Sequence, residues 1–135
     1  MAIQFSVSVR NARLDAIETT AGTAVLFRIY SGSAPADCAT AATGTLLAEA
    51  TLPSDWMAAA ASGSKAKSGT WQDASANAAG TAGYFRIYDS AGTTCHVQGT
   101  VTATGGGGDL TLDNTSIASA QNVTITGFTL TDANA

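Results

Sequence analysis

The chain has 135 residues, the size of a single domain, and 45% of them are apolar while only 12% are charged. Its net charge is −4 and its six basic residues are scattered, so it lacks the basic patch of a nucleic-acid-binding protein. No apolar run is long enough to span a bilayer and the N-terminus lacks a secretory signal pattern, so we expect one domain, residues 1–135, that is made in a cytoplasm and binds neither nucleic acid nor membrane.

Apolar and polar residues alternate at the N-terminus. The apolar members are Ile3, Phe5, Val7 and Val9. A period of two predicts a half-buried strand, or an arm within residues 1–10 that becomes a strand by pairing with a partner. Because a free strand can add to the edge of another sheet, these four residues are a candidate contact with a partner chain.

The spacing of apolar residues changes at Asn11. Leu14 and Ile17 are three positions apart, which is a helical spacing. Asn11 can cap the first turn of a helix, and Gly22 can close the last one. The sequence therefore predicts a short helix over residues 11–20.

The tetrapeptide Phe-Arg-Ile-Tyr occurs twice, at residues 27–30 and 85–88. In both copies Phe and Ile alternate with Arg and Tyr, which is the period of a β-strand. We expect two central strands, over residues 23–31 and 83–88, as equivalent members of two packed sheets. A chance repeat in a strand-rich chain is the alternative.

The two sides of these strands differ in chemistry. The Phe and Ile side should face a core, whereas the Arg and Tyr side can keep its polar tips in solvent. Tyr and Arg are favoured at protein interfaces, so a contact face is expected at Arg28, Tyr30, Arg86 and Tyr88. An ordinary sheet surface or a second core layer is the alternative.

A cysteine follows each copy of the tetrapeptide, at Cys38 and Cys95. Two cysteines do not make a disulfide framework. A reducing compartment favours two buried thiols, and a single bridge between them stays open as the alternative.

A strand is predicted over residues 45–52, and a long surface excursion with at most one helical turn follows over residues 54–69. Loops of this length in a compact domain are often functional or ordered by a partner. Trp56 in this excursion is either a core residue or a contact anchor. Lys65 and Lys67 extend the candidate contact, because their long side chains can reach another subunit.

The second half of the sequence predicts strands and turns. A short strand is expected at residues 70–73, and the alternating residues 95–101 should form a hairpin with residues 83–88. The glycine run at residues 105–108 reads as a linker or hinge rather than a phosphate loop, because a strand, over residues 109–113, follows it instead of a helix.

The last strand contains a phase change. The apolar alternation of residues 123–126 shifts by one position at Gly127 and resumes over residues 128–130. Glycine at such a shift predicts a β-bulge, or a bend that carries the chain from one sheet edge to another. Residues 131–135 are expected to be a frayed tail. About eight short strands with one short helix are typical of an all-β domain, a β-sandwich or jelly roll.

No catalytic signature is visible. The one histidine, His96, follows Cys95, but neighbours on a strand point to opposite faces. Asp109 and Asp113 read as a solvated face rather than a metal site. The glutamates lie outside any aromatic-rich setting that would suggest glycoside cleavage. We therefore expect a protein that is not an enzyme and that has no catalytic residues, metal or cofactor.

Residues 11–20, 26–33, 44–49 and 109–117 together resemble a family of small virion proteins of tailed bacteriophages and prophages, and the resemblance covers nearly the whole chain. Some small cement, or decoration, proteins of phage capsids are jelly rolls of this size that sit over the joints between capsid hexamers and pentamers. The resemblance implies a structural virion protein on the capsid exterior. Its implied partners are the major capsid protein and a second copy of itself, as a homodimer rather than a trimer.

Two other functions stay open at this point. One is a host-recognition module that binds surface glycan at a tail or fibre tip. The other is a neck or tail-completion protein. Many copies on the head would favour cement, and a few at the tail would favour recognition.

Overall fold

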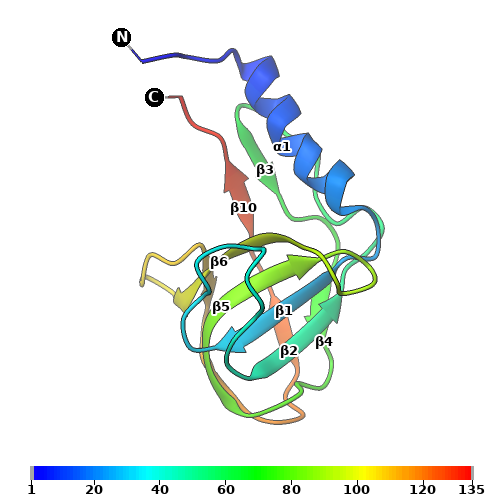
Figure 1. Cartoon of the computed structure of the whole chain (residues 1–135), viewed down its shortest axis with the longest axis vertical. Coiled ribbons are helices and arrows are strands. Elements are labelled where there is room, and N and C mark those ends of the chain that lie inside the picture. Colours follow the sequence, from blue (N-terminus) through cyan, green and yellow to red (C-terminus); the bar gives the residue numbers. More distant parts are fainter. Residues whose placement is uncertain (1, 135) are drawn as a thin grey trace.

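The computed structural model describes residues 2–134, and this part of the chain is β-rich with one helix (Figure 1). In chain order the elements are α1 (Val7–Ala21), β1 (Leu26–Ser31), β2 (Leu46–Thr51), β3 (Ser64–Ala66), β4 (Trp71–Asp73), β5 (Gly80–Tyr88), β6 (Cys95–Ala103), β7 (Leu110–Leu112), β8 (Ser116–Ile117), β9 (Val123–Ile125) and β10 (Thr129–Thr131). The expectation of a mostly β protein with one short helix is confirmed.

A curled central sheet organises the molecule. Its strand order is β2-β1-β5-β6-β7, with β8 paired to β5. The pairs are antiparallel except β6 with β7, which is parallel. The predicted hairpin of β5 and β6 is confirmed. Two further two-stranded sheets, β4 with β9 and β3 with β10, complete the set within residues 2–134.

The two tetrapeptides are direct neighbours in this one sheet. The paired positions are Phe27 with Ile87, Arg28 with Arg86, Ile29 with Phe85 and Tyr30 with Tyr84. Both strands are central, as predicted, but their placement in two packed sheets is wrong. Side chains on paired positions share a face, so the apolar sides of both copies combine into one surface, and so do the two Arg and Tyr sides.

The main core lies on the Phe and Ile side. Its buried aromatic residues are Phe27, Trp56, Trp71, Phe85 and Phe128. The rings of Phe27 and Phe85 stack across the two strands with centroids 5.2 Å apart. Trp56 and Trp71 are fully buried, so the predicted surface excursion over residues 54–69 is wrong at its start, where the chain turns inward.

The helix begins earlier than its spacing predicts. Ser6 is the N-cap, and its hydroxyl accepts a hydrogen bond from the Val9 amide at 3.3 Å. The predicted strand over residues 3–9 is therefore wrong, because this cap draws Val7 and Val9 into the first helical turn. The predicted end is close to the observed one: Gly22 adopts φ +90°, and its amide donates to the Glu18 carbonyl at 2.9 Å.

Gly127 marks the bend that its phase shift predicts. Before it β9 pairs with β4, and after it β10 pairs with β3. The chain thus passes from one small sheet to another, and the expectation of a change of sheet is confirmed.

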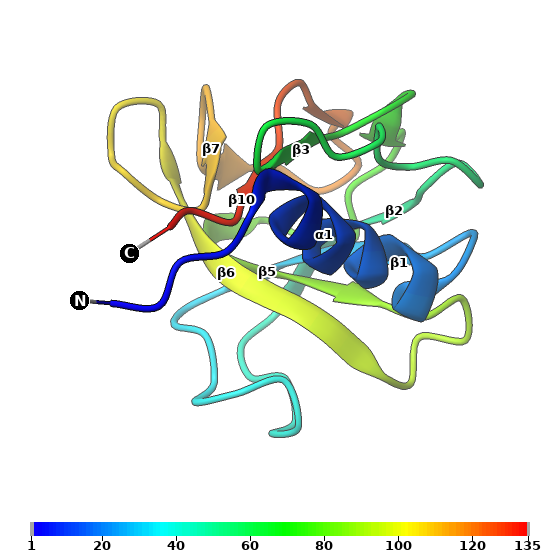
Figure 2. The ribbon, with the colours of Figure 1, turned by 90° about the horizontal axis from the view of Figure 1, so that it is seen from above.

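A terminal lobe, formed by α1, residues 57–67 with β3, and β10, stands on the central sheet, and both ends of the described chain leave from it (Figures 1 and 2). The Phe5 backbone exchanges two hydrogen bonds with the Asn134 side chain, at 2.8 and 3.0 Å. Arg13 forms an ion pair with Asp132 at 3.1 Å. These contacts fasten the N-terminal segment to the segment after β10, so residues 131–134 are tied down rather than frayed.

Candidate functional site

Three places in the molecule carry residues that the sequence singles out: the apolar N-terminal segment, the Arg and Tyr side of the central sheet, and a polar pocket beside α1. All three are positioned by the terminal lobe or by the paired strands β1 and β5.

The N-terminal segment presents an apolar row to solvent. Its members and their exposed fractions are Ile3 79%, Phe5 43%, Val7 47% and Val9 43%. These are the large exposed apolar residues of the described chain. The Arg13 guanidinium lies over the Phe5 ring at 5.0 Å from its centroid, which helps to hold that ring in place. The row is thus displayed by a fastened segment and the first turn of α1, not by a strand.

The Arg and Tyr side of the sheet is a second buried layer. A cover loop, residues 32–45, closes over Tyr30, Tyr84 and Tyr88, and Tyr84 exchanges hydrogen bonds with the Thr43 backbone through its hydroxyl. The Tyr30 and Tyr84 rings stack with centroids 5.0 Å apart. The expected contact face at Tyr30 and Tyr88 is therefore wrong, and the alternative of a second core layer holds, because the cover loop takes the place of a partner.

Arg86 is the most deeply buried polar group of this layer, with 1% of its surface exposed. It donates to the Gln98 side chain at 3.1 Å, to the Tyr88 hydroxyl at 3.3 Å and to the Asp37 carbonyl at 3.0 Å. All three acceptors are uncharged. As a contact residue Arg86 is also a wrong prediction, since its guanidinium is used to anchor the cover loop.

Arg28 stays nearer the surface. Its Nε donates to the Glu49 carboxylate at 2.6 Å, and its guanidinium lies 4.7 Å from the centroid of the Tyr88 ring. Burial, followed by a hydrogen bond with Tyr88, raises the pKa of Tyr30 to about 12.

A cavity of about 340 Å³ lies between this tyrosine layer and the cover loop, and Cys38 and Cys95 both line it.

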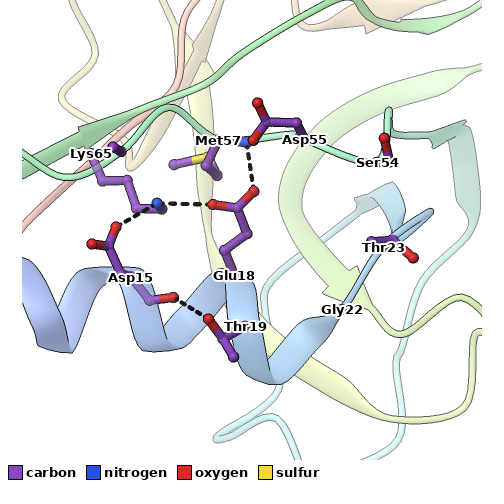
Figure 3. Close-up of a pocket in the computed structure, with 10 residues that line it drawn as sticks. Asp15, Glu18, Thr19, Gly22, Thr23, Ser54, Asp55, Met57 and Lys65 are labelled. Atoms are coloured by element: carbon purple, nitrogen blue, oxygen red, sulfur yellow. Dashed lines mark hydrogen bonds and ion pairs between the residues drawn. The ribbon is translucent and has the colours of Figure 1, made fainter.

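The polar pocket has a volume of about 530 Å³ and lies between α1 and the segment that follows Pro53 (Figure 3). Asp15 and Glu18 point from one face of the helix toward Lys65, as the close-up shows. The Lys65 ammonium donates to Asp15 at 2.7 Å, to Glu18 at 2.9 Å and to the Ala58 carbonyl at 2.9 Å. Its three donors are all used.

The two carboxylates of this pocket also accept backbone amides. Asp15 accepts from Ala60 at 3.0 Å, and Glu18 accepts from Met57 at 3.4 Å. The hydrogen bond from Lys65, followed by that from Ala60, lowers the pKa of Asp15. These two acids and the saturated Lys65 ammonium join α1 to the chain beside it, and we interpret the cluster as a structural clip.

Lys65 was expected to reach outward, but its side chain is only 2% exposed, so that expectation is wrong. Lys67 remains at the surface, where its ammonium donates to the Gly69 carbonyl at 2.7 Å.

Trp56 is a core residue rather than a contact anchor, and its indole N–H donates to the Gly22 carbonyl at 3.0 Å. The spacing of Asp15 and Glu18, three apart on a helix, is the sequence signal that could have located the partners of Lys65.

His96 lies on β6 and faces a shallow hollow shared with Arg13 and Ile17 of α1. Residues 2–134 contain no group of three His, Cys, Asp or Glu side chains placed to hold a metal ion. Within the same residues, no helix has the length and apolar character needed to cross a membrane.

No protein-family model matches the chain, and it has no significant match among curated proteins or solved structures.

Proposed function

We propose that this protein is a structural virion protein of a tailed bacteriophage, a cement protein that binds the outside of the head and bridges capsid subunits. The observation that carries the proposal is the apolar row at Ile3, Phe5, Val7 and Val9, which lies exposed on a segment that the terminal lobe holds in place. The resemblance of the sequence to small virion proteins supports the phage setting.

The apolar row suits a contact with another chain because it is both exposed and ordered. Burying the remaining exposed surface of one such side chain is worth on the order of 1 kcal/mol. Because the segment is already fastened, little ordering entropy is lost on binding. Each contact is modest, but many copies on one shell add to a large stabilisation of the particle.

The partners in this proposal are the major capsid protein and a second copy of the chain. The row would pack into an apolar groove of a capsid subunit, and a homodimer would place two such rows across the joint between subunits. A jelly-roll or sandwich architecture stays part of the proposal, and the small sheets that pack beside the central one support it.

The proposal is tested on particles assembled without this protein. Purified protein should bind such particles in many copies and restore their resistance to heat and osmotic shock. A variant with Ile3, Phe5, Val7 and Val9 all changed to Ser should bind at least tenfold more weakly, in line with a loss of more than 1.4 kcal/mol.

A matched control changes two exposed alanines outside the lobe, Ala91→Ser and Ala118→Ser, and should bind like the original protein. Equal binding by the four-residue variant would contradict the role of the apolar row. Normal stability of particles that lack the protein would argue against cementing, and a few copies confined to the tail would favour host recognition instead.

A further inference from the structure

The two cysteines line one cavity in the folded protein although they are far apart in the sequence. Cys95 begins β6 and packs against the tyrosine layer. Cys38 lies on the cover loop, and both line the same cavity. Both are free cysteines, and neither is exposed: each is half-buried. A cross-link between them would join the cover loop to the edge of the sheet strand on which it rests.

The position of Cys38 is set by backbone anchors on the cover loop. The carbonyl of Asp37, the residue before it, accepts from buried Arg86 at 3.0 Å. The carbonyl of Pro35 accepts from the side-chain amide of Gln98 at 2.8 Å. The Asp37 carboxylate accepts from the Thr40 backbone amide at 2.8 Å and closes the turn that contains Cys38. Cys38 is therefore held opposite β6 by contacts that do not involve its own side chain.

We propose that Cys38 and Cys95 form an intramolecular disulfide when the folded protein meets a small-molecule disulfide oxidant such as oxidised glutathione. The bond would staple the cover loop onto β6 and seal the Arg and Tyr side of the sheet. The inference is independent of the virion role, because it rests on the loop, the strand and the two thiols alone.

The chemistry balances without any other reactant. The Cys38 thiolate attacks the glutathione disulfide, forms a mixed disulfide and releases one glutathione thiolate. Cys95 sulfur then attacks the Cys38 sulfur, forms the internal bond and releases the second thiolate. The two protons lost by the cysteines end on the two glutathiones, so the protein is oxidised by two electrons and the oxidant is reduced by two.

Cys38 is the thiol that starts the exchange. Burial, followed by the neighbouring Cys38, raises the pKa of Cys95 to about 12, so Cys95 stays protonated near neutral pH and is a poor first nucleophile. Arg86 lies beside Cys95, and its positive charge favours the thiolate that Cys95 must become in the second step.

The expected consequence is a more stable fold. The bond closes a loop of about 60 residues, and cross-links of this span restrict the unfolded chain strongly. For a domain of this size the melting temperature should rise by roughly 10 °C. Exchange of the backbone amides of Thr43 and Thr45, which both lie in the cover loop and donate hydrogen bonds to Tyr84 and Ser31, should slow when the bond forms.

The test treats the native protein with oxidised glutathione and then counts free thiols and measures the intact mass. We expect both thiols to disappear together, the mass to fall by two hydrogen atoms, and the chain to stay monomeric on a non-reducing gel. Persistence of both thiols, a bond between chains, or reaction only after unfolding in urea would each overturn the proposal.

Two single variants provide the matched controls. Cys38→Ser and Cys95→Ser each keep one thiol, so each should give a glutathione adduct or no reaction and no rise in melting temperature. If either variant fails to fold, the original protein before and after reduction supplies the same comparison. The proposal that the bond fastens the cover loop to β6 would be contradicted if the melting temperature did not rise on oxidation, or did not fall back to its starting value on reduction.

Discussion

Arg28 and Arg86 occupy the same place in two copies of one tetrapeptide and lie opposite each other across two strands, yet their surroundings differ. Arg28 pairs with the Glu49 carboxylate on β2, which lies directly opposite it. Arg86 faces Gln98 on β6 and has no ion-pair partner within the described chain. The difference teaches that the outer neighbour of each strand, not the tetrapeptide itself, decides what the arginine does.

Lys65 extends the comparison to a third cation. Arg86 is held by neutral acceptors, Arg28 by one carboxylate, and Lys65 by two carboxylates, those of Asp15 and Glu18. The three differ in how much of their stabilisation is ionic, and that can be measured.

The largest effect is expected for Arg86→Ala. The change leaves the Asp37 carbonyl and the Tyr88 hydroxyl without their donor and opens a hole beneath the cover loop, so the free energy of unfolding should fall by about 3 kcal/mol. Arg28→Ala should cost about 1 kcal/mol, because Glu49 can regain water. Urea unfolding of both variants measures the difference. Equal losses would contradict a role set by the neighbouring strand.

Lys65→Met is expected to have an intermediate effect. It leaves the Asp15 and Glu18 carboxylates close together without their cation, and the loss should be about 2 kcal/mol at neutral pH. Lys67→Met is the control, because the Lys67 ammonium donates to the Gly69 carbonyl and lies 5.7 Å from the centroid of the Trp71 ring, but has no carboxylate partner within the described chain. If the two lysine variants unfolded at the same urea concentration, the contacts of Lys65 with Asp15 and Glu18 would not be a structural clip.

The smallest effect concerns acid. The pKa of Asp15 is lowered in the folded protein, so its contribution to stability is present above the unfolded pKa, near 3.8, and is lost as the pH falls through the folded value. Melting temperatures between pH 5 and about pH 2 should therefore fall less steeply for Asp15→Asn than for the original chain. If melting temperature falls with pH equally for both proteins, the contact between Asp15 and Lys65 does not stabilise the fold.

The strands of the central sheet could be predicted from sequence because alternation with a period of two indicates which side chains share a face. The alternation does not indicate what covers that face. The cover loop has the Gly and Pro content of an ordinary surface loop, so nothing in its sequence shows that the Thr43 and Asp37 backbones meet Tyr84 and Arg86. The sequence therefore leaves a contact face and a second core layer both open, and the structure shows the second core layer.

The N-terminal segment illustrates a competition that periodicity cannot decide. Residues 3–9 alternate like a strand, but Ser6 can cap a helix, and a single cap is worth about 1 kcal/mol. The structure leaves the four apolar residues exposed, and their contact with a partner chain stays a prediction.

The pairing of Phe5 with Asn134 has a practical consequence for anyone who wishes to label this molecule. A tag that continues the chain beyond either residue starts on the terminal lobe, beside the apolar row, and would crowd that surface. The turn at residues 89–94, which joins β5 to β6, is away from the two ends (Figure 1). A dye or affinity peptide inserted there leaves the apolar row unobstructed.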